Sequence, residues 1–233
     1  MRGENFKRAY FYISRSRNPT WCKWLGADAT KSTTDCDISR GGDIEGICHR
    51  DMLRFNKQSL AFYSEVLPYF YGYIEANIPM KKEYTLLDVG ARTGTGSNFI
   101  GQMFADTDWG YKLKLTVDTT GKSRDWNDYI KLMPYINRSY NTDIFDMKEK
   151  TYDICFCSHT IEHVDNPVDF VRQLKKIARQ FAFITCPFGE VNPIPGHHTI
   201  TKEIVEECNP KYVKTYKSVN RWKEELECVV FVV

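Results

Sequence analysis

The 233-residue sequence has no long hydrophobic run and almost no net charge. Its longest apolar segments, such as residues 229–233, are far too short to span a bilayer. The basic N-terminal stretch lacks the apolar segment that a secretory signal needs. A formal net charge of +2 provides no global field that would attract nucleic acid. The sequence therefore predicts no membrane span and favours a cytoplasmic protein.

The sequence also lacks any Cys-x-x-Cys pair, although it contains eight cysteines. This absence disfavours a zinc site with the common ligand spacing. Several cysteines, including Cys155, Cys157 and Cys186, fall within predicted buried strands, where a free cysteine packs as a small hydrophobic residue. Buried cysteines without disulfide partners are typical of proteins in a reducing compartment.

Residues 1–55 are rich in Asp, Gly, Ser, Thr and Arg, which predicts a loop-rich N-terminal extension or lid ahead of a main domain at 56–233. Residues 1–24 hold six Lys or Arg residues against one acid, and six minus one gives a local charge of +5. We expect a solvated basic arm. The alternative is that Arg15 or Arg17 contacts an anionic group on a cofactor or acceptor.

The apolar spacing predicts a helix over 56–77 that is interrupted at Pro68. Beyond it, strand and helix patterns alternate. Strands are predicted at 84–89, 113–118, 152–157, 181–186, 212–219 and 226–232, and helices at 96–105, 125–133, 167–179 and 201–208. The last two strands have no long helix between them, so we expect an antiparallel hairpin at one sheet edge. This alternation predicts a doubly wound α/β sheet.

The most informative stretch is Thr85–Ser97, an apolar strand that runs through Asp88 into a glycine-rich turn and then an amphipathic segment. A strand, glycine turn and helix in this order are how α/β proteins hold a nucleoside cofactor. Asp118 ends the next strand, where an acidic side chain can accept hydrogen bonds from both ribose hydroxyls. The dinucleotide pattern G-x-G-x-x-G does not occur, because Arg92 and Phe99 stand where it needs glycine. The spacing therefore disfavours a nicotinamide oxidoreductase.

The loop instead resembles the D-x-G-x-G-x-G loop of class I S-adenosylmethionine (SAM)-dependent methyltransferases. Three positions match, namely Asp88, Gly90 and Gly94, while Arg92 replaces the middle glycine. The segment Tyr152–Val164 is similar to the fourth-strand motif of that family, which often reads F-D-x-x-x-x-S-E-x-x-E-H-x. The resemblance covers roughly residues 84–190. It implies a mostly parallel, seven-stranded sheet with an antiparallel C-terminal hairpin, SAM as cofactor and S-adenosylhomocysteine as product.

The resemblance also implies which residues hold the cofactor. The glycine loop would lie along the methionine moiety, and the end of the second strand would bind the ribose and adenosine. The segment after the third strand would hold the adenine, and the end of the fourth strand would lie near the reactive methyl group. These residues are Asp88, Gly90, Ala91 and Gly94 in the glycine loop, Asp118 and Thr119 at the end of the second strand, Asp143 and Ile144 after the third strand, and Cys157 and Ser158 at the end of the fourth strand. For Asp143 the alternative is a turn role, because its surroundings are turn-like.

Four of the five histidines fall in two places, His159 with His163 and His197 with His198. Both segments should reach the carboxyl edge of the sheet, where ligands bind in open α/β sheets. One interpretation is structural, with Glu162 and His163 bracing the turn after the strand. A second makes His159, His163 or His198 a general base for a hydroxyl acceptor.

A third interpretation is a divalent metal ion. Some relatives, including ubiquinone-pathway O-methyltransferases and small-RNA 2′-O-methyltransferases, bind one through an E-x-x-E-H motif. Here His159 replaces the first Glu, which leaves Glu162, His163 and His197 as the predicted ligands, with His159 or His198 as further candidates. Such a nitrogen-rich set suits Zn, Mn, Fe or Co better than Mg.

We expect in-line O-methylation of a sugar, a glycan or another small hydroxylated molecule, with a histidine base. An RNA 2′-O-methyltransferase with metal assistance is an alternative, although nucleic acid is the less favoured acceptor. A binding module that keeps the fold without catalysis is another, because Arg92 and His159 both depart from the family pattern. The sequence predicts no oligomeric state, and a domain cut from a larger enzyme would look the same.

Overall fold

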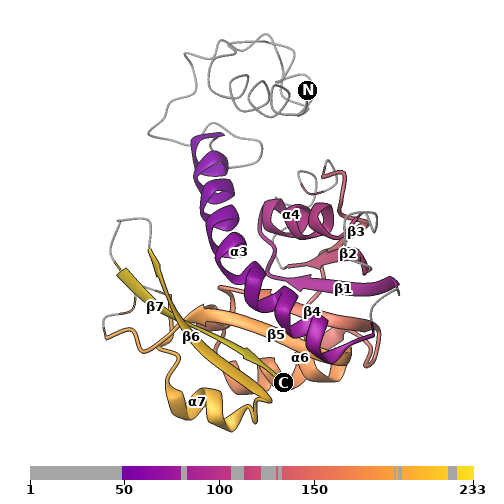
Figure 1. Cartoon of the computed structure of the whole chain (residues 1–233). Helices are drawn as coiled ribbons and strands as arrows, with labels where there is room; N and C mark the ends of the chain where they lie inside the picture. Colours follow the sequence, from indigo (N-terminus) through magenta and orange to yellow (C-terminus); the bar gives the residue numbers. More distant parts are fainter. Residues whose placement is uncertain are drawn as a thin grey trace. The chain divides into compact units, whose positions relative to one another are not determined.

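The computed structural model describes residues 49–79, 83–105, 113–121, 130, 133–191, 193, 196–219 and 225–233, with side chains from residue 57 onward (Figure 1). By compactness the chain divides into two units, Met1–Asp51 and Met52–Val233, and the sheet belongs to the second. The basic residues of the N-terminal arm, Arg15 and Arg17 included, lie outside the described residues.

The described strands form one seven-stranded sheet with the order β3-β2-β1-β4-β5-β7-β6. The strands are β1 (Glu83–Val89), β2 (Lys114–Thr120), β3 (Arg138–Tyr140), β4 (Tyr152–Ser158), β5 (Ala178–Pro187), β6 (Tyr212–Val219) and β7 (Glu225–Val232). Pairing is parallel from β3 to β5, whereas β7 runs antiparallel to both β5 and β6. This arrangement confirms the predicted doubly wound sheet with its C-terminal hairpin at one edge.

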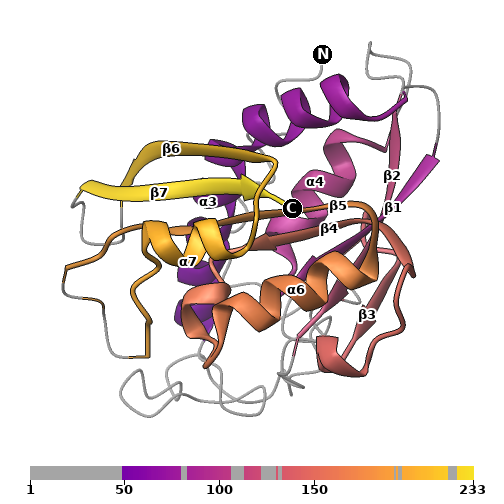
Figure 2. The ribbon, with the colours of Figure 1, turned by 90° about the horizontal axis from the view of Figure 1, so that it is seen from below.

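Helices cover both faces of the sheet (Figure 2). They are α3 (His49–Asn77), α4 (Thr95–Met103), α6 (Pro167–Ile177) and α7 (Lys202–Glu207), with short 3-10 turns η1 (Ile144–Asp146) and η2 (Ile161–His163). Two of them begin at a residue whose side chain caps the helix. Asn166 caps α6 by accepting a bond from the Asp169 N–H at 3.1 Å, and Thr201 caps α7 by accepting one from the Ile204 N–H.

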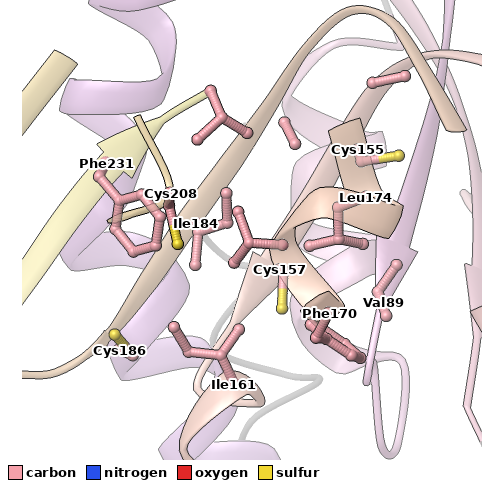
Figure 3. Close-up of a cluster of buried hydrophobic side chains, with 14 of the residues drawn as sticks. Val89, Cys155, Cys157, Ile161, Phe170, Leu174, Ile184, Cys186, Cys208 and Phe231 are labelled. Atoms are coloured by element: carbon pink, nitrogen blue, oxygen red, sulfur yellow. The ribbon is translucent and has the colours of Figure 1, made fainter. Parts of the chain in front are cut away.

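Each face of the sheet buries its own apolar cluster. One cluster joins α3 and α4 to β1, β2, β4 and β5 through side chains such as Phe70 and Phe156. The other joins α6 and α7 to the opposite face and contains Leu174, Ile184 and Phe231 (Figure 3). Because β4 contributes fully buried side chains to both clusters, it is the central strand that its unbroken apolar run predicted.

Helix α3 is longer than predicted. It begins at His49 rather than 56, and it continues through Pro68 without a break. A proline removes one intrahelical hydrogen bond, but the residues around it are held by packing, since Val66, Phe70 and Ile74 are fully buried. Tertiary packing therefore outweighs the local cost of the proline.

The other boundaries differ by a few residues. Strand β5 starts at Ala178, directly after α6, and the short strand β3 was missing from the list of predicted strands. The helix predicted at 125–133 falls mostly outside the described residues. In the described part of the chain, no helix has both the length and the apolarity that crossing a bilayer requires.

Candidate functional site

The glycine loop after β1 has the backbone conformation that its sequence predicts. Gly90 and Gly94 have φ values of 80° and 71°, in the left-handed region that favours glycine. A side chain on Gly90 would collide with the Thr160 hydroxyl, and the Gly90 N–H donates to the Thr120 carbonyl at 2.9 Å. Arg92 adopts φ 47° and is exposed. The loop therefore keeps a glycine-like turn at the position where the family pattern has glycine, and the long side chain is on the surface.

Asp88, at the end of β1, is fully buried and anchored on one side only. Its Oδ2 atom accepts bonds from the Tyr63 hydroxyl at 2.8 Å and the Ser97 hydroxyl at 2.6 Å. Its Oδ1 atom is buried without a hydrogen-bond partner among the described residues. Burial raises the pKa of Asp88 to about 7, although both hydroxyl bonds act in the opposite direction. The carboxyl group thus titrates near neutrality and connects α3 to the glycine loop.

This shift predicts a pH-dependent stability. Because the pKa of Asp88 is above its ordinary value of 3.8, the folded state holds a proton that the unfolded chain releases between about pH 4 and pH 7. The free energy of unfolding should fall as the pH rises through that window, by up to about 1.4 kcal/mol per pH unit. Asp88→Asn removes this dependence, so the melting temperature of the variant minus that of the wild type should be larger at pH 8 than at pH 5. Asp146→Asn, which changes an exposed acid, is the control; the same difference at both pH values for Asp88→Asn would contradict the assignment.

Several buried polar atoms at the carboxyl ends of the central strands have no hydrogen-bond partner among the described residues. Besides Asp88 Oδ1, they include Thr119 Oγ1, Ser158 Oγ, His159 Nε2 and Glu162 Oε2. A buried polar atom without a partner is costly, and these atoms come from three strand ends, those of β1, β2 and β4. Such a group of atoms is typical of a ligand-binding site in which the ligand supplies the missing hydrogen bonds.

Asp118 lies two residues before the end of β2 and is held by the protein itself. Its oxygens accept bonds from the Tyr152 hydroxyl at 2.7 Å, the Asn137 amide at 2.8 Å and the Tyr140 hydroxyl at 3.3 Å. These donors come from β4, β3 and the residue before β3. The carboxylate therefore ties three strands together, and a ribose would have to share it with them. Its predicted ribose role stays a prediction.

Asp118→Asn should separate the two roles. An amide cannot accept all of these bonds, so we expect the variant to lose about 2 kcal/mol of stability. Tyr152→Phe removes one bond to the same carboxylate and should lower stability without changing the affinity for S-adenosylhomocysteine. If Asp118 binds ribose, Asp118→Asn also weakens that affinity roughly tenfold or more, as measured by calorimetry. An unchanged melting temperature would contradict the network.

The remaining predicted cofactor residues are Asp143, Ile144, Cys157, Ser158 and Ala91, and their surroundings in the structure differ. Asp143 caps η1 by accepting a bond from the Phe145 N–H at 3.2 Å, and Ile144 is buried in the core, with its carbonyl accepting from Gln173. Cys157 is fully buried, and burial raises the pKa of its thiol well above the usual range, so that it is an unreactive core residue. Ala91 is buried beside Gly90. Of the pair at the end of β4, Ser158 is therefore the one with a polar atom to offer.

The histidines from two remote segments meet at the end of β4. The rings of His163 and His197 are 4.3 Å apart, in an edge-to-face arrangement. The His198 N–H donates to the Glu162 carbonyl at 2.6 Å, which fixes the later segment against η2. His159 has φ 50° and stacks on Phe62, and its Nδ1 lies 3.7 Å from Glu162. The predicted convergence of the two segments is confirmed, while the side chain of His198 is exposed.

The cluster is strongly perturbed by burial. Burial, together with the positive charge of Arg92, lowers the pKa of His159 to about 3, so that this imidazole is neutral and a weak base. Burial raises the pKa of Glu162 to about 8. The pKa of His163 is lowered by burial and by its neighbour His197. These directions disfavour His159 as the general base of the site.

Glu162, His163 and His197 form a group that could hold a metal ion. Their ligand atoms all lie within 4.8 Å of one another. Glu162 is only 1% exposed, and its Oε2 atom has no hydrogen-bond partner among the residues that the structure describes. The Nδ1 atoms of the two imidazoles face outer acceptors, the Gly196 carbonyl at 3.2 Å for His163 and Glu190 at 3.4 Å for His197. This leaves each Nε2 for an ion, as is usual for metal-bound histidines.

Sequence reasoning missed the contribution of α3. Phe62 and Tyr63 fall within the predicted helix 56–77 and had no predicted role in the site, yet Phe62 stacks on His159 and Tyr63 donates a hydrogen bond to Asp88. Glu190, which contacts His197, had no predicted role either. No local pattern marks these residues. A signal exists only in the fold, because a helix packed across the strand ends must present some side chains to them.

Comparison with known proteins agrees with this geometry. Residues 87–185 match a family model described as a methyltransferase domain. A search of curated protein sequences gives no match. Among solved structures, a SAM-dependent methyltransferase from Methanosarcina mazei superposes with a TM-score of 0.53 at 9% identity, covering 68% of this chain and 94% of that one.

Two further structures show the range of the fold. The magnesium protoporphyrin IX methyltransferase from Synechocystis PCC 6803, solved with bound SAM, gives a TM-score of 0.51 at 12% identity and covers 97% of this chain and 95% of that one. The [4+2]-cyclase SpnF gives a TM-score of 0.53 at 9% identity and covers 69% of this chain and 77% of its own. At these identities the likeness establishes the fold alone. The chain therefore has the class I SAM-dependent methyltransferase fold, and its residues 87–185 match the methyltransferase-domain family.

Proposed function

We propose that the chain transfers the methyl group of SAM to a hydroxyl of a sugar, a glycan or another small hydroxylated molecule. The observation that supports this most is the position of Glu162, His163 and His197. Glu162 and His163 lie in η2, just after Ser158, and His197 joins them from the loop after β5. They share the edge of the sheet that carries the glycine loop and the polar atoms without a partner among the described residues. A cofactor site and a group suited to binding an oxygen acceptor therefore share one edge of the sheet.

The proposed cofactor site combines the glycine loop with the ends of β2 and β4. Gly90 and Gly94 bring the backbone close to the ligand, and Thr119 Oγ1 and Ser158 Oγ offer hydrogen bonds that no described residue takes. Asp118, Asp143 and Ile144 remain proposed contacts to the ribose and adenine. Methyl transfer from a sulfonium is an in-line displacement, so these residues act mainly by fixing the methyl donor against the acceptor oxygen.

The acceptor hydroxyl must lose its proton as the new carbon–oxygen bond forms. A divalent ion held by Glu162, His163 and His197 would lower the pKa of a bound hydroxyl. With His159 neutral and His163 proposed as a ligand, His198 is the remaining proposed base. Its backbone is anchored to Glu162 and its side chain is exposed. In the balanced step, the methyl group moves from sulfur to oxygen, the proton moves to imidazole, and S-adenosylhomocysteine leaves uncharged at sulfur.

The proposal also includes the domain organisation of the chain and the cellular compartment in which it acts. We take residues 1–55 as an extension and residues 56–233 as the methyltransferase domain. A reducing compartment such as the cytoplasm is supported by five buried free cysteines, Cys155, Cys157, Cys186, Cys208 and Cys228. The cyclase SpnF has a similar fold. Because this fold therefore also occurs in a cyclase, methyl transfer by the present chain is to be measured directly.

Two measurements provide that test. Calorimetry with SAM, S-adenosylhomocysteine and NAD should show binding of the first two only; tight NAD binding without SAM binding would overturn the proposal. A screen of sugars, small phenols and RNA with methyl-labelled SAM, with Mn²⁺ or with EDTA, should then give labelled sugar in the presence of metal. Binding of SAM without transfer to any acceptor would favour a binding module.

A further inference from the structure

Helix α3 presents one face to the end of β4 and to β6. Phe62 stacks on His159, with ring centroids 3.7 Å apart and planes inclined by 9°. Two turns later, Tyr69 contacts the ring of Tyr216 at 5.6 Å. Residues three, four and seven positions apart share one face of a helix. Glu65 lies between these two contacts and therefore faces the same region.

The Glu65 side chain has an unsatisfied oxygen in this region. Its Oε2 atom is buried and has no hydrogen-bond partner among the described residues. Its charge acts on Cys228, whose pKa burial raises to about 12, and Glu162 and Glu190 act on the same thiol. Cys228 pairs with Pro187, the last residue of β5. Carboxyl groups from α3, η2 and the loop after β5 are thus all near enough to Cys228, at the carboxyl edge of the sheet, to act on its thiol.

The protein does not complete the hydrogen bonding of this region within its described residues. The Tyr216 hydroxyl is bonded to Thr185 Oγ1 at 2.8 Å, while Glu162 Oε2 and His159 Nε2 are buried without partners. Glu162 is 1% exposed, and the His159 side chain is 10% exposed. The oxygen of a Glu65 carboxylate accepts bonds only, so its missing partner must be a donor. A carboxylate at this place disfavours a phosphate or carboxylate group beside it.

We propose that Glu65 determines acceptor specificity by accepting a hydrogen bond from an uncharged, polyhydroxylated acceptor. The same site discriminates against acceptors that carry a phosphate near the reacting hydroxyl. This inference rests on the proposed function and narrows it from hydroxylated molecules in general to sugar-like polyols. It also gives α3 a role as the acceptor-facing wall of the site, opposite the loop that contains Glu190.

The experiment compares the wild type with Glu65→Gln in methyl transfer to neutral hexoses and to their 6-phosphates, with SAM and Mn²⁺. We expect the neutral sugars to show a KM at least roughly tenfold lower than their phosphates. In Glu65→Gln, the KM for the best sugar should rise roughly tenfold, with kcat, the melting temperature and the affinity for S-adenosylhomocysteine unchanged. Glu75→Gln, on the exposed side of the same helix, is the matched control and should change none of these values.

Other outcomes separate this inference from the function on which it rests. Preference for the phosphorylated sugars, or an unchanged KM in Glu65→Gln, overturns the role of Glu65. Transfer to phenols or RNA but to no sugar overturns the polyol class and leaves the methyltransferase proposal standing. Absence of SAM and S-adenosylhomocysteine binding overturns the proposed function itself.

Discussion

Gly96→Ala should cost about 3 kcal/mol of stability. A methyl group at this position of α4 would lie 2.6 Å from three ring carbons of Tyr63. That ring cannot move aside easily, because it is buried and its hydroxyl is bonded to Asp88. Overpacking of this kind costs about 1–3 kcal/mol, and displacement of the phenol would also break a buried hydrogen bond to the carboxyl group. Chemical denaturation of the ligand-free protein measures the loss.

The same substitution elsewhere in the chain provides a control of opposite sign. Gly72 lies on the exposed side of α3, and a methyl group there would meet nothing within 4 Å. Gly72→Ala should therefore stabilise the protein by about 1 kcal/mol through helix propensity. If both variants shifted stability in the same direction, the proposed contact between Tyr63 and the glycine loop would be wrong.

Replacement of either proposed histidine ligand should abolish metal binding and turnover together. We expect His163→Ala and His197→Ala to weaken Mn²⁺ binding roughly 100-fold or more, since loss of even an outer partner costs about 10- to 100-fold. Methyl transfer should fall to background in both variants and in wild type treated with EDTA. Electron paramagnetic resonance of free Mn²⁺ measures the affinity, and labelled SAM measures the turnover.

His198→Ala serves as the control for metal binding. Its side chain is not among the residues whose ligand atoms converge, and its link to Glu162 is through the backbone. Mn²⁺ affinity should therefore be unchanged in this variant, whatever happens to its turnover. If EDTA and both ligand variants left methyl transfer at the wild-type rate, the imidazoles would be structural rather than metal ligands.

The fold could be predicted from the sequence because its signals are local. The buried run at Ile154–Cys157 fixes β4 as a central strand, and Asn166 and Thr201 begin their helices as caps. Boundaries were less accurate where packing overrides local preference. Pro68 does not interrupt α3, because the apolar residues on both sides of it are fixed in the core.

Only those parts of the candidate site that follow from the order and direction of the strands could be predicted from the sequence. The carboxyl ends of parallel strands meet at one edge, which correctly placed Glu162 and His163 near His197. Topology says nothing about which side chains α3 contributes, so the bond from Tyr63 to Asp88 was not predicted. Nor could the sequence show that Asp118 would accept bonds from two tyrosines, which depends on how β3 and β4 flank it.

The order of strands also has a consequence for how the chain folds. Strand β7 is the last of the seven described strands along the sequence, yet it lies between β5 and β6. Until it is made, residues Phe183–Pro187 of β5 present an unpaired and strongly apolar edge. Pairing of this kind between distant segments slows folding and leaves such an edge open to other chains. Nascent or truncated chains that end before residue 225 should therefore aggregate, and chaperone dependence during synthesis is a natural outcome of this topology.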